Sequence, residues 1–162
     1  MTWRTLSTGS AETEALGELL GRLLNPPAVV ELRSDLGGGK TTFVKGLARG
    51  AGSDDEVTSP TFTLSQVYRS SSGVTIAHHD FYRLSEPGVM ADELAESLGD
   101  DSNITVVEWG DIVKDVLPRE RIAVEFKLVA SDTDEREITF EYPENLGGII
   151  KKLETEWTRI RP

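Results

Sequence analysis

A glycine-rich stretch between a short apolar run and a helical pattern holds the residue types in this chain that could do chemistry. It reads Ser34-Asp35-Leu36-Gly37-Gly38-Gly39-Lys40-Thr41-Thr42. Glycines let the backbone N–H groups of a loop point at an anion, and a helix that begins there adds the positive end of its dipole. A lysine followed by a hydroxyl residue is typical of a loop that holds nucleotide phosphates and their Mg²⁺. The stretch therefore predicts a P-loop.

The segments on either side of the glycines support this prediction. Residues 28–32 are expected to form a buried strand, and a helix is expected from about Thr41 to Arg49. In a P-loop, Lys40 would reach the β- and γ-phosphates, and the hydroxyl of Thr41 would ligate Mg²⁺. Ser34 stands where the pattern has its first glycine, and a small residue there predicts only a modest local change. The alternative is a flexible glycine turn beside an ordinary helical lysine.

Two acidic residues end apolar strands elsewhere in the chain. Asp80 follows residues 74–79, and Glu108 follows residues 104–107. If both strands run parallel to the P-loop strand, both carboxylates reach the same edge of the sheet, where an acid can hold Mg²⁺ or orient water. Each could instead be an exposed turn residue. The two histidines beside Asp80 could suggest a transition metal, but the chain has no further histidine and no cysteine to complete a zinc site.

The remaining pattern predicts a mixed sheet between helices. Leucines spaced three and four apart indicate a first helix with Ser10 as its N-cap. The further expected elements are a hairpin of strands over 62–69 and 74–79, a helix from Glu86-Pro87 to Gly99, a second hairpin over 122–128 and 135–141, and a C-terminal helix. We therefore predict an α/β fold in one domain spanning residues 1–162. It is a P-loop NTPase-like mixed sheet, with a parallel core and antiparallel additions, flanked by helices.

Bulk composition limits the function classes. The chain has 162 residues, no cysteine and a net charge of −11. Disulfide and thiolate chemistry are excluded, and the chain contains no secretory h-region and no membrane-spanning run, so a soluble cytoplasmic protein is expected. A surface this acidic repels the phosphates of nucleic acid, which disfavours strong direct binding of RNA or DNA. It would suit a basic protein partner, or it provides solubility alone.

Four motifs together resemble the TsaE family, also called YjeE, of small bacterial P-loop ATPases in the tRNA threonylcarbamoyladenosine (t6A) pathway. They are residues 35–42, Thr58-Ser59-Pro60-Thr61-Phe62, His79-Asp80-Phe81-Tyr82-Arg83-Leu84 and Val107-Glu108-Trp109. The motifs have the order and spacing of the family, and the resemblance covers nearly the whole chain. One departure is Gly110, because a proline usually follows the Glu-Trp pair in this family.

The resemblance implies a set of site residues. Those implied to bind ATP are Ser10, Asp35, Gly37, Gly38, Gly39, Lys40, Thr41, Thr42 and Thr61. Thr41, Asp80 and Glu108 are implied at the Mg²⁺ ion, and the implied catalytic set is Lys40, Asp80 and Glu108. Which of the two acids touches the metal directly is left open. Residues 59–61 would form a switch-like loop near the γ-phosphate, and residues 8–10 would lie near the adenine.

The resemblance also implies partners and a reaction. Family members act with TsaB and TsaD, and TsaD transfers the threonylcarbamoyl group to adenosine 37 of tRNAs that read codons beginning with A. The chain would then hydrolyse ATP to keep that complex cycling and would meet tRNA only through its partners. We expect slow hydrolysis alone, because Lys40 and Mg²⁺ are the only cations that the motifs place at the phosphates. Arg69, Arg83 and Arg136 are candidates whose positions the sequence does not give.

Other functions share the same loop. A nucleotide-gated adaptor would bind ATP and partners without turnover, and Asp80 and Glu108 argue for hydrolysis instead. A small P-loop kinase is disfavoured because the chain has no arginine-rich lid and no evident second-substrate domain. A GTPase is disfavoured because the sequence contains no N-K-x-D motif.

Overall fold

The computed structural model describes residues 1–34, 37–60 and 64–161. The strands of this part are β1 (Thr2–Ser7), β2 (Ala28–Arg33), β3 (Ser65–Arg69), β4 (Thr75–Asp80), β5 (Asn103–Glu108), β6 (Ile122–Leu128) and β7 (Arg136–Glu141). Its helices are α1 (Ser10–Leu23), α2 (Lys40–Gly50), α3 (Met90–Gly99) and α4 (Gly147–Ile160), with short 3₁₀ turns η2 (Gly110–Val113) and η3 (Glu144–Leu146). None of the helices in this described part is long and apolar enough to cross a membrane.

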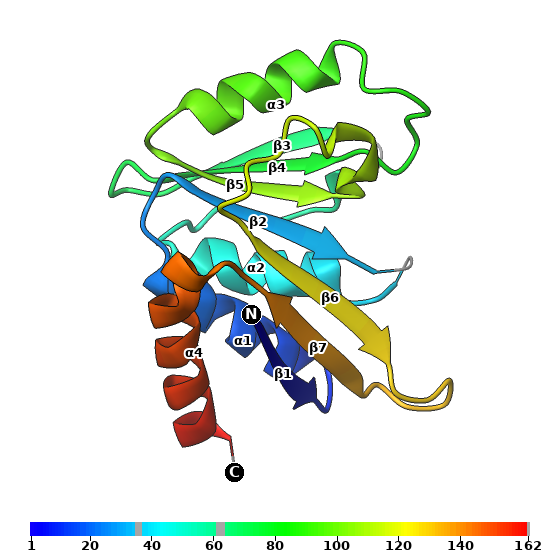
Figure 1. Ribbon diagram of the computed structural model, residues 1–162. Helices are drawn as coiled ribbons and strands as arrows, with labels where there is room; N and C mark the ends of the chain where they lie inside the picture. The colour runs from blue at the N-terminus through cyan, green and yellow to red at the C-terminus, as the bar shows by residue number, and fades with distance from the viewer. Residues whose placement is uncertain (35–36, 61–63, 162) are drawn as a thin grey trace.

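The strands form one seven-stranded sheet in the order β1-β7-β6-β2-β5-β4-β3 (Figure 1). β2 pairs in parallel with β5 and β6, and β4 pairs in parallel with β5. β7, β1 and β3 are added antiparallel at the two sides. The predicted mixed sheet with a parallel core is therefore confirmed. Because β2, β5 and β4 run in one direction, their carboxyl ends meet at one edge of the sheet, where the P-loop begins.

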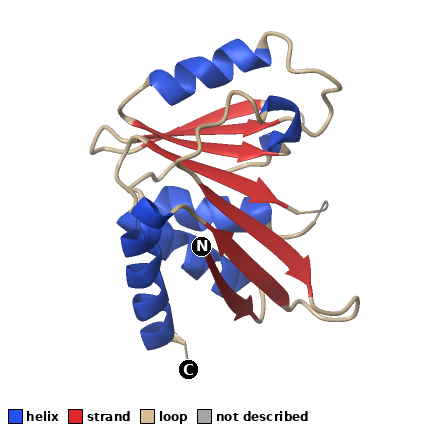
Figure 2. Ribbon diagram, in the orientation of Figure 1, coloured by secondary structure: helices blue, strands red, loops and turns tan. Residues whose placement is uncertain are grey.

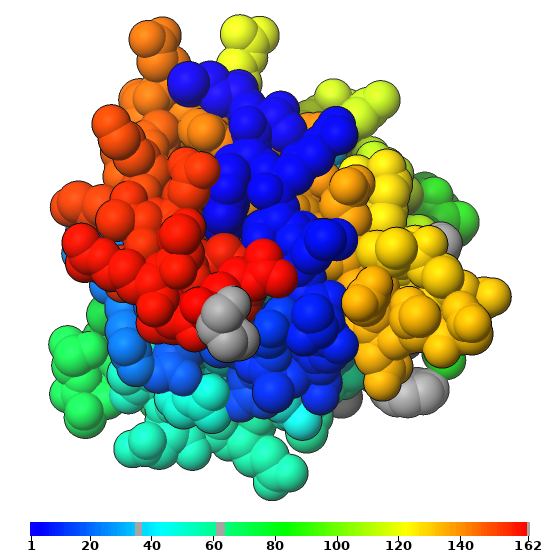
Figure 3. All heavy atoms as spheres, turned by 90° about the horizontal axis from the view of Figure 1, so that it is seen from below, coloured from blue at the N-terminus to red at the C-terminus, as the bar shows by residue number. Residues whose placement is uncertain are grey.

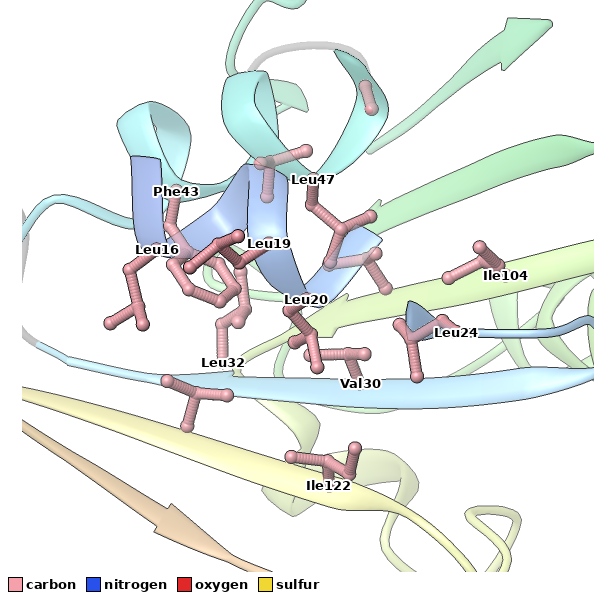
Figure 4. Packing of buried hydrophobic residues seen from close by; sticks show 14 of the residues in the cluster. Leu16, Leu19, Leu20, Leu24, Val30, Leu32, Phe43, Leu47, Ile104 and Ile122 are labelled. Atoms are coloured by element: carbon pink, nitrogen blue, oxygen red, sulfur yellow. The ribbon is translucent and has the colours of Figure 1, made fainter. Parts of the chain in front are cut away.

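Helices cover both faces of the sheet (Figure 2). Residues of α1, α2 and α4 pack with β2, β5 and β6 in the larger core, while α3 and η2 cover the other face in a smaller one. Figure 4 shows part of the larger core, in which leucines of α1 and Phe43 and Leu47 of α2 meet Val30 and Leu32 of β2. The central strands β2, β4 and β5 are therefore largely buried on both faces.

The backbones of α1 and α2 lie in direct contact, because four glycines leave no side chain between them. A Cβ atom at Gly46 of α2 would overlap the carbonyl oxygen of Glu14 in α1, and one at Gly17 of α1 would overlap the carbonyl oxygen of Phe43. Gly21 and Gly50 make the same kind of close approach one turn further along the pair. Ion pairs from Arg49 to Glu14 and Glu18 close the exposed side of the contact. α2 is thus held against α1 at a fixed distance.

The strand β1 is absent from the sequence-based prediction. It pairs antiparallel with β7 and places Trp3 against Phe140, with ring centroids 5.0 Å apart. The hydroxyl of Thr5 accepts a hydrogen bond of 2.8 Å from the indole of Trp157 in α4. Figure 3 shows α4, in red, lying against the N-terminal segment, in blue. β1 therefore ties the C-terminal helix to the edge of the sheet.

Two predicted element starts are wrong. Ser10 is the first residue of α1 and Gly9 is its N-cap, without a side-chain capping bond. The Glu12 carboxylate instead accepts the backbone N–H of Thr8 at 2.8 Å, which fixes the entry to the helix. α3 begins at Met90, not at Glu86-Pro87, because Gly88 takes a φ of 50° and the chain turns there first. The strand expected over 62–69 is found as β3 from Ser65, and residue 62 lies outside the described residues.

The side chain of His79 joins β4 to α3 on the face opposite α1 and α2. Its Nε2 atom lies 2.9 Å from the hydroxyl oxygen of Ser97, and its ring stacks on Phe81 with centroids 6.2 Å apart. Burial, with a smaller contribution from the neighbouring His78, lowers the pKa of His79 from 6.5 to about 4. The folded protein therefore holds this ring neutral at pH values where the unfolded chain protonates it.

Substituting alanine at Gly46 should destabilise the protein by about 1–3 kcal/mol, because the new methyl group forces two helix backbones apart. Urea unfolding monitored by circular dichroism measures the change. Gly148→Ala is the matched control, since nothing lies within 4 Å of a Cβ atom there and the site is also helical. Equal stability of Gly46→Ala and the unaltered protein would contradict the backbone contact.

His79 should make the free energy of unfolding depend on pH between about 6.5 and 4. A group with a lowered folded pKa adds stability above its unfolded pKa, and that stability is lost as the pH falls through the folded pKa. The loss should approach about 3 kcal/mol below pH 4, since one pKa unit corresponds to about 1.4 kcal/mol. Denaturant unfolding of His79→Gln across this range isolates the contribution, because the variant should lack this part of the pH slope. Identical slopes in both proteins would refute the assignment.

Candidate functional site

The glycine loop joins the end of β2 to the start of α2. Gly39 is the N-cap of α2 with a φ of 103°, and Gly37 has a φ of 79°. Both values lie in the left-handed region that L-residues disfavour, so the loop conformation depends on glycine at these two positions. α2 has no side-chain capping bond because its N-cap residue is a glycine, and its first-turn N–H groups point toward the loop. This is the arrangement of an anion-binding helix end.

Lys40 lies at the start of α2 with only 6% of its surface exposed. Its Nζ atom donates a hydrogen bond of 3.1 Å to the carbonyl oxygen of Ser34 and lies 5.3 Å from the centroid of the Trp109 ring. The ammonium group is thus held over the loop between the end of β2 and the ring that follows β5. Ser34, which replaces the first glycine of the motif, lies half-buried directly after β2.

One cleft of about 220 Å³ opens over the loop. Its lining residues are Gly37, Gly38, Gly39, Lys40, Thr41, Thr42, Ser59 and Glu108. The structure therefore brings together the glycines, the lysine, both threonines and one of the two acids singled out from the sequence. Ser59 reaches the same cleft from the segment between α2 and β3. Of the other residues implied at the nucleotide, Asp35 and Thr61 lie outside the described residues.

Glu108 and Asp80 end neighbouring parallel strands and are paired with each other in register. Glu108 is also in register with Leu32 of β2, which places it beside the start of the loop. Both carboxyl groups are buried, with relative exposures of 2% and 1%. Asp80 lies one strand further from the loop, and its Oδ1 atom accepts the backbone N–H of Tyr82 at 2.9 Å. Glu108 is thus the acid that lines the cleft.

The donor set of this cleft fits Mg²⁺ and not a transition metal. Within the described residues, no group of three or more histidine, aspartate or glutamate side chains could hold a metal ion. Mg²⁺ is commonly held by one or two protein oxygens together with phosphate oxygens and water, and Thr41 and Glu108 offer such oxygens. The two histidines alternate across β4, where His78 meets Glu108 and His79 meets Ser97, so they do not share one ion.

A second hollow of about 220 Å³ adjoins the loop on its other side. It is lined by Gly9, Ser10, Thr13, Gly37, Gly39, Thr42, Asp134 and Arg136. Arg136 donates from Nε to the carbonyl oxygen of Gly38 at 3.1 Å, and its Nη1 atom is buried without a hydrogen-bond partner among the described residues. A buried guanidinium N–H without an acceptor is costly unless an anion completes it.

Among the three candidate arginines, Arg136 is the one whose hydrogen bond to a described residue of the loop is seen. Arg69 is the last residue of β3 and is in register with Thr75, the first residue of β4. Asp80 is the last residue of β4, so Arg69 and Asp80 lie at opposite ends of that strand. Arg83 is exposed in the segment after β4. The sequence names Arg136 only as a candidate without a position, because its place in the fold depends on the antiparallel pairing of β7.

Trp109 directly follows Glu108 and packs under Lys40 beside the cleft. Its φ of 58° is left-handed, and its ring lies 4.8 Å from that of Tyr82 and beneath Lys40. Gly110 follows, buried, and a Cβ atom there would come within 3.0 Å of Leu117 and 3.2 Å of the Glu31 carboxylate. The glycine at the position where the family usually has proline thus packs closely against Glu31.

Glu31 is a buried carboxylate in β2, with 4% of its surface exposed. It accepts hydrogen bonds from Nε and Nη2 of Arg33 at 3.2 and 3.0 Å and from Nε of Arg121 at 2.7 Å. Burial raises the pKa of Glu31, but the hydrogen bonds and charges of Arg33 and Arg121 outweigh burial and lower this pKa below 4.5. Sequence reasoning missed Glu31, although two arginines and an acid near an apolar strand could have indicated a buried ion pair. The cluster braces the turn that carries Trp109 and Gly110.

Comparisons with known proteins agree with this geometry. The family model described as threonylcarbamoyl adenosine biosynthesis protein TsaE matches residues 7–138. A protein of Treponema pallidum named tRNA threonylcarbamoyladenosine biosynthesis protein TsaE is 39% identical over 136 residues, covering 84% of this chain and 98% of that protein. The Bacillus subtilis protein of the same name is 39% identical over 143 residues, covering 85% of this chain and 83% of its own.

A solved structure shares the fold. The crystal structure of Bacillus subtilis YdiB matches with a TM-score of 0.76 and 29% sequence identity, covering 96% of each chain. The strand order, the glycine loop between β2 and α2, and the family match over most of the chain all point the same way. This chain belongs to the TsaE family.

Proposed function

We propose that this protein binds ATP with Mg²⁺ and hydrolyses it in the service of t6A modification of tRNA. The observation that carries the proposal is the single cleft that combines a P-loop, the Thr41 hydroxyl and the Glu108 carboxylate. The relatives are named for t6A biosynthesis, which supplies the biological setting. The proposal rests on the chemistry of this cleft and on that shared family.

Each residue of the cleft has a role in the proposed reaction. The N–H groups of Gly37 to Gly39 and Lys40 would bind the phosphate chain, and Thr42 would add a hydroxyl contact. Thr41 and Glu108 would hold Mg²⁺, directly or through water. When bound, Mg²⁺ offsets negative charge on the phosphate oxygens during phosphoryl transfer. Asp80, buried behind Glu108, would assist at the metal or the hydrolytic water from the next strand.

The second hollow would extend the nucleotide site beyond the phosphates. Ser10 lines it from the start of α1, which supports an adenosine site on that side of the loop. Arg136 of β7 would donate a hydrogen bond to an oxygen of the nucleotide, since its Nη1 atom is buried without a partner among the described residues. Its Nε bond to Gly38 keeps it beside the loop. We propose that Arg136 contacts the nucleotide and neutralises part of its charge.

Lys40→Ala should weaken binding of ATP and ADP by about 10- to 100-fold, because a charge-assisted contact worth about 1.5–3 kcal/mol is lost. Glu108→Gln should bind Mg²⁺-free ADP normally but slow phosphate release in a single turnover by about 10² or more. Calorimetry measures the first effect and rapid-quench kinetics the second. The control is Lys45→Ala, which removes an exposed lysine from the same helix.

Each outcome of that experiment decides between the functions. Unchanged ADP binding by Lys40→Ala would overturn the nucleotide site. Nucleotide binding without phosphate release would favour the adaptor over the ATPase. Transfer of the phosphate to a metabolite in place of water would favour the kinase.

We further propose that TsaB and TsaD are the partners and that they accelerate hydrolysis. Among the described arginines, none lines the cleft over the loop, and a supplied arginine is worth about 10³–10⁵ in rate. The net charge of −11 suits contact with tRNA through partners, not directly. Steady-state phosphate release should therefore rise when TsaB and TsaD are added together. Equal turnover with and without them would refute this part of the proposal while leaving the ATP site intact.

A further inference from the structure

We propose that His78 is the positioning residue for Glu108. Its imidazole holds one carboxylate oxygen of Glu108, so that the other oxygen is directed at the cleft over the loop. The inference rests on the proposed function of that cleft and adds a residue to its machinery.

The contact between the two side chains is short and fully buried. His78 Nε2 lies 2.8 Å from Glu108 Oε1, and the two residues are 0% and 2% exposed. His78 is in register with Val106, two residues before Glu108 on the adjacent parallel strand. Side chains two positions apart on neighbouring strands share one face of the sheet. Here that face carries α2 and the loop.

The direction of the hydrogen bond follows from the chemistry of the acceptor. A carboxylate only accepts, so the proton of this bond lies on Nε2 of His78. The other ring nitrogen, Nδ1, is buried with no hydrogen-bond partner among the described residues. A buried ring with one unpaired nitrogen costs free energy that an apolar side chain would not. The bond to Glu108 is what the imidazole contributes at this position.

A tyrosine packs against the imidazole from β3. The Tyr68 ring is centred 6.2 Å from that of His78, and its hydroxyl donates a 2.8 Å hydrogen bond to the carbonyl oxygen of Thr58. Burial and the charge of Glu108 raise the pKa of Tyr68 above 10.0, so this hydroxyl keeps its proton. Thr58 directly precedes Ser59, which lines the cleft. The imidazole is therefore fixed between Glu108 and the segment that brings Ser59 to the loop.

A glutamate at the end of a strand can take several rotamers, and only some direct an oxygen at a bound metal or water. Residues that orient a metal-binding side chain typically change metal affinity or activity by about 10- to 100-fold when they are removed. Within the part of the chain that the structure describes, the side chain of His78 contacts Glu108 and Tyr68 and makes no hydrogen bond to the loop. Its loss should therefore affect Mg²⁺ and turnover, and leave the binding of Mg²⁺-free nucleotide unchanged.

The adjacent His79 provides a matched control within the same strand. It is also buried, but its ring faces α3 and meets Ser97, on the side of the sheet away from Glu108. A substitution there changes a buried histidine of β4 without touching Glu108. A change in Mg²⁺ affinity or turnover that is common to the His78 and His79 variants indicates a loss of core packing. A change confined to the His78 variants indicates that Glu108 has lost its orientation.

The experiment compares four variants with the unaltered protein near neutral pH: His78→Leu, His78→Gln, His78→Asn and His79→Gln. The Gln amide can place a donor where Nε2 lies, and the Asn amide is one methylene too short to reach Glu108. Calorimetry gives the affinity for ADP without Mg²⁺ and the Mg²⁺ concentration at which ADP-loaded protein is half-saturated. Single-turnover phosphate release is measured in parallel, and thermal unfolding checks that each variant folds.

We expect His78→Leu and His78→Asn to need about tenfold more Mg²⁺ and to hydrolyse ATP more slowly by at least that factor. His78→Gln should recover most of both properties, and His79→Gln should match the unaltered protein. All four variants should bind Mg²⁺-free ADP equally well.

Two results would overturn the inference alone. One is an unchanged Mg²⁺ dependence in a folded His78→Leu variant whose ADP binding is normal. The other is equal behaviour of His78→Gln and His78→Asn, which decides the question even if His78→Leu does not fold. Failure of the unaltered protein to bind ADP at all would instead overturn the proposed function together with this inference.

Discussion

The contact between the backbones of α1 and α2 is the constraint on which the site depends. Glycines at matching turns of both helices allow carbonyl oxygens of one helix to lie where side chains of the other would stand. α2 cannot slide or tilt without breaking several of these contacts at once, because close-packed interiors resist small displacements. Its first turn is therefore presented to the loop at a fixed position. A phosphate site made of backbone N–H groups needs this rigidity, since those groups have no side-chain freedom with which to adjust.

The site also requires that residues far apart in the sequence meet, and the parallel strands bring them together at their carboxyl ends. β2 leads into the loop, β5 ends at Glu108 and β4 ends at Asp80. The register between these strands brings the two acids side by side and sets Glu108 next to the loop. β4 adds His78 on the same face, so that one pair of adjacent strands carries both the acid and the group that orients it. The order and register of these strands therefore determine which side chains meet at the site.

Much of this arrangement could be predicted from the sequence, and the exceptions have physical causes. The loop, its flanking strand and helix, and the acids at strand ends are local patterns, and parallel strands end at a common edge. β1 was missed because its short alternation becomes a strand only through pairing with β7. The positions of Arg136 and His78 depend on strand order and register, which no local pattern encodes. Ser10 was misplaced by one residue as N-cap because Glu12 fixes the entry to α1 through the backbone of Thr8.

The charge cluster around Glu31 joins elements that are not neighbours in the sheet. Arg33 reaches from β2 to Glu141 of β7, with the whole width of β6 between them. Its bond to Glu141 is largely exposed, whereas its bonds to Glu31 are shielded from water. Dissolved ions weaken exposed pairs far more than shielded ones. High ionic strength should therefore weaken the Arg33–Glu141 pair first, while the pairs with Glu31 persist. The antiparallel strand β7 can then lose this link to β2 without any change in the strands beside the loop.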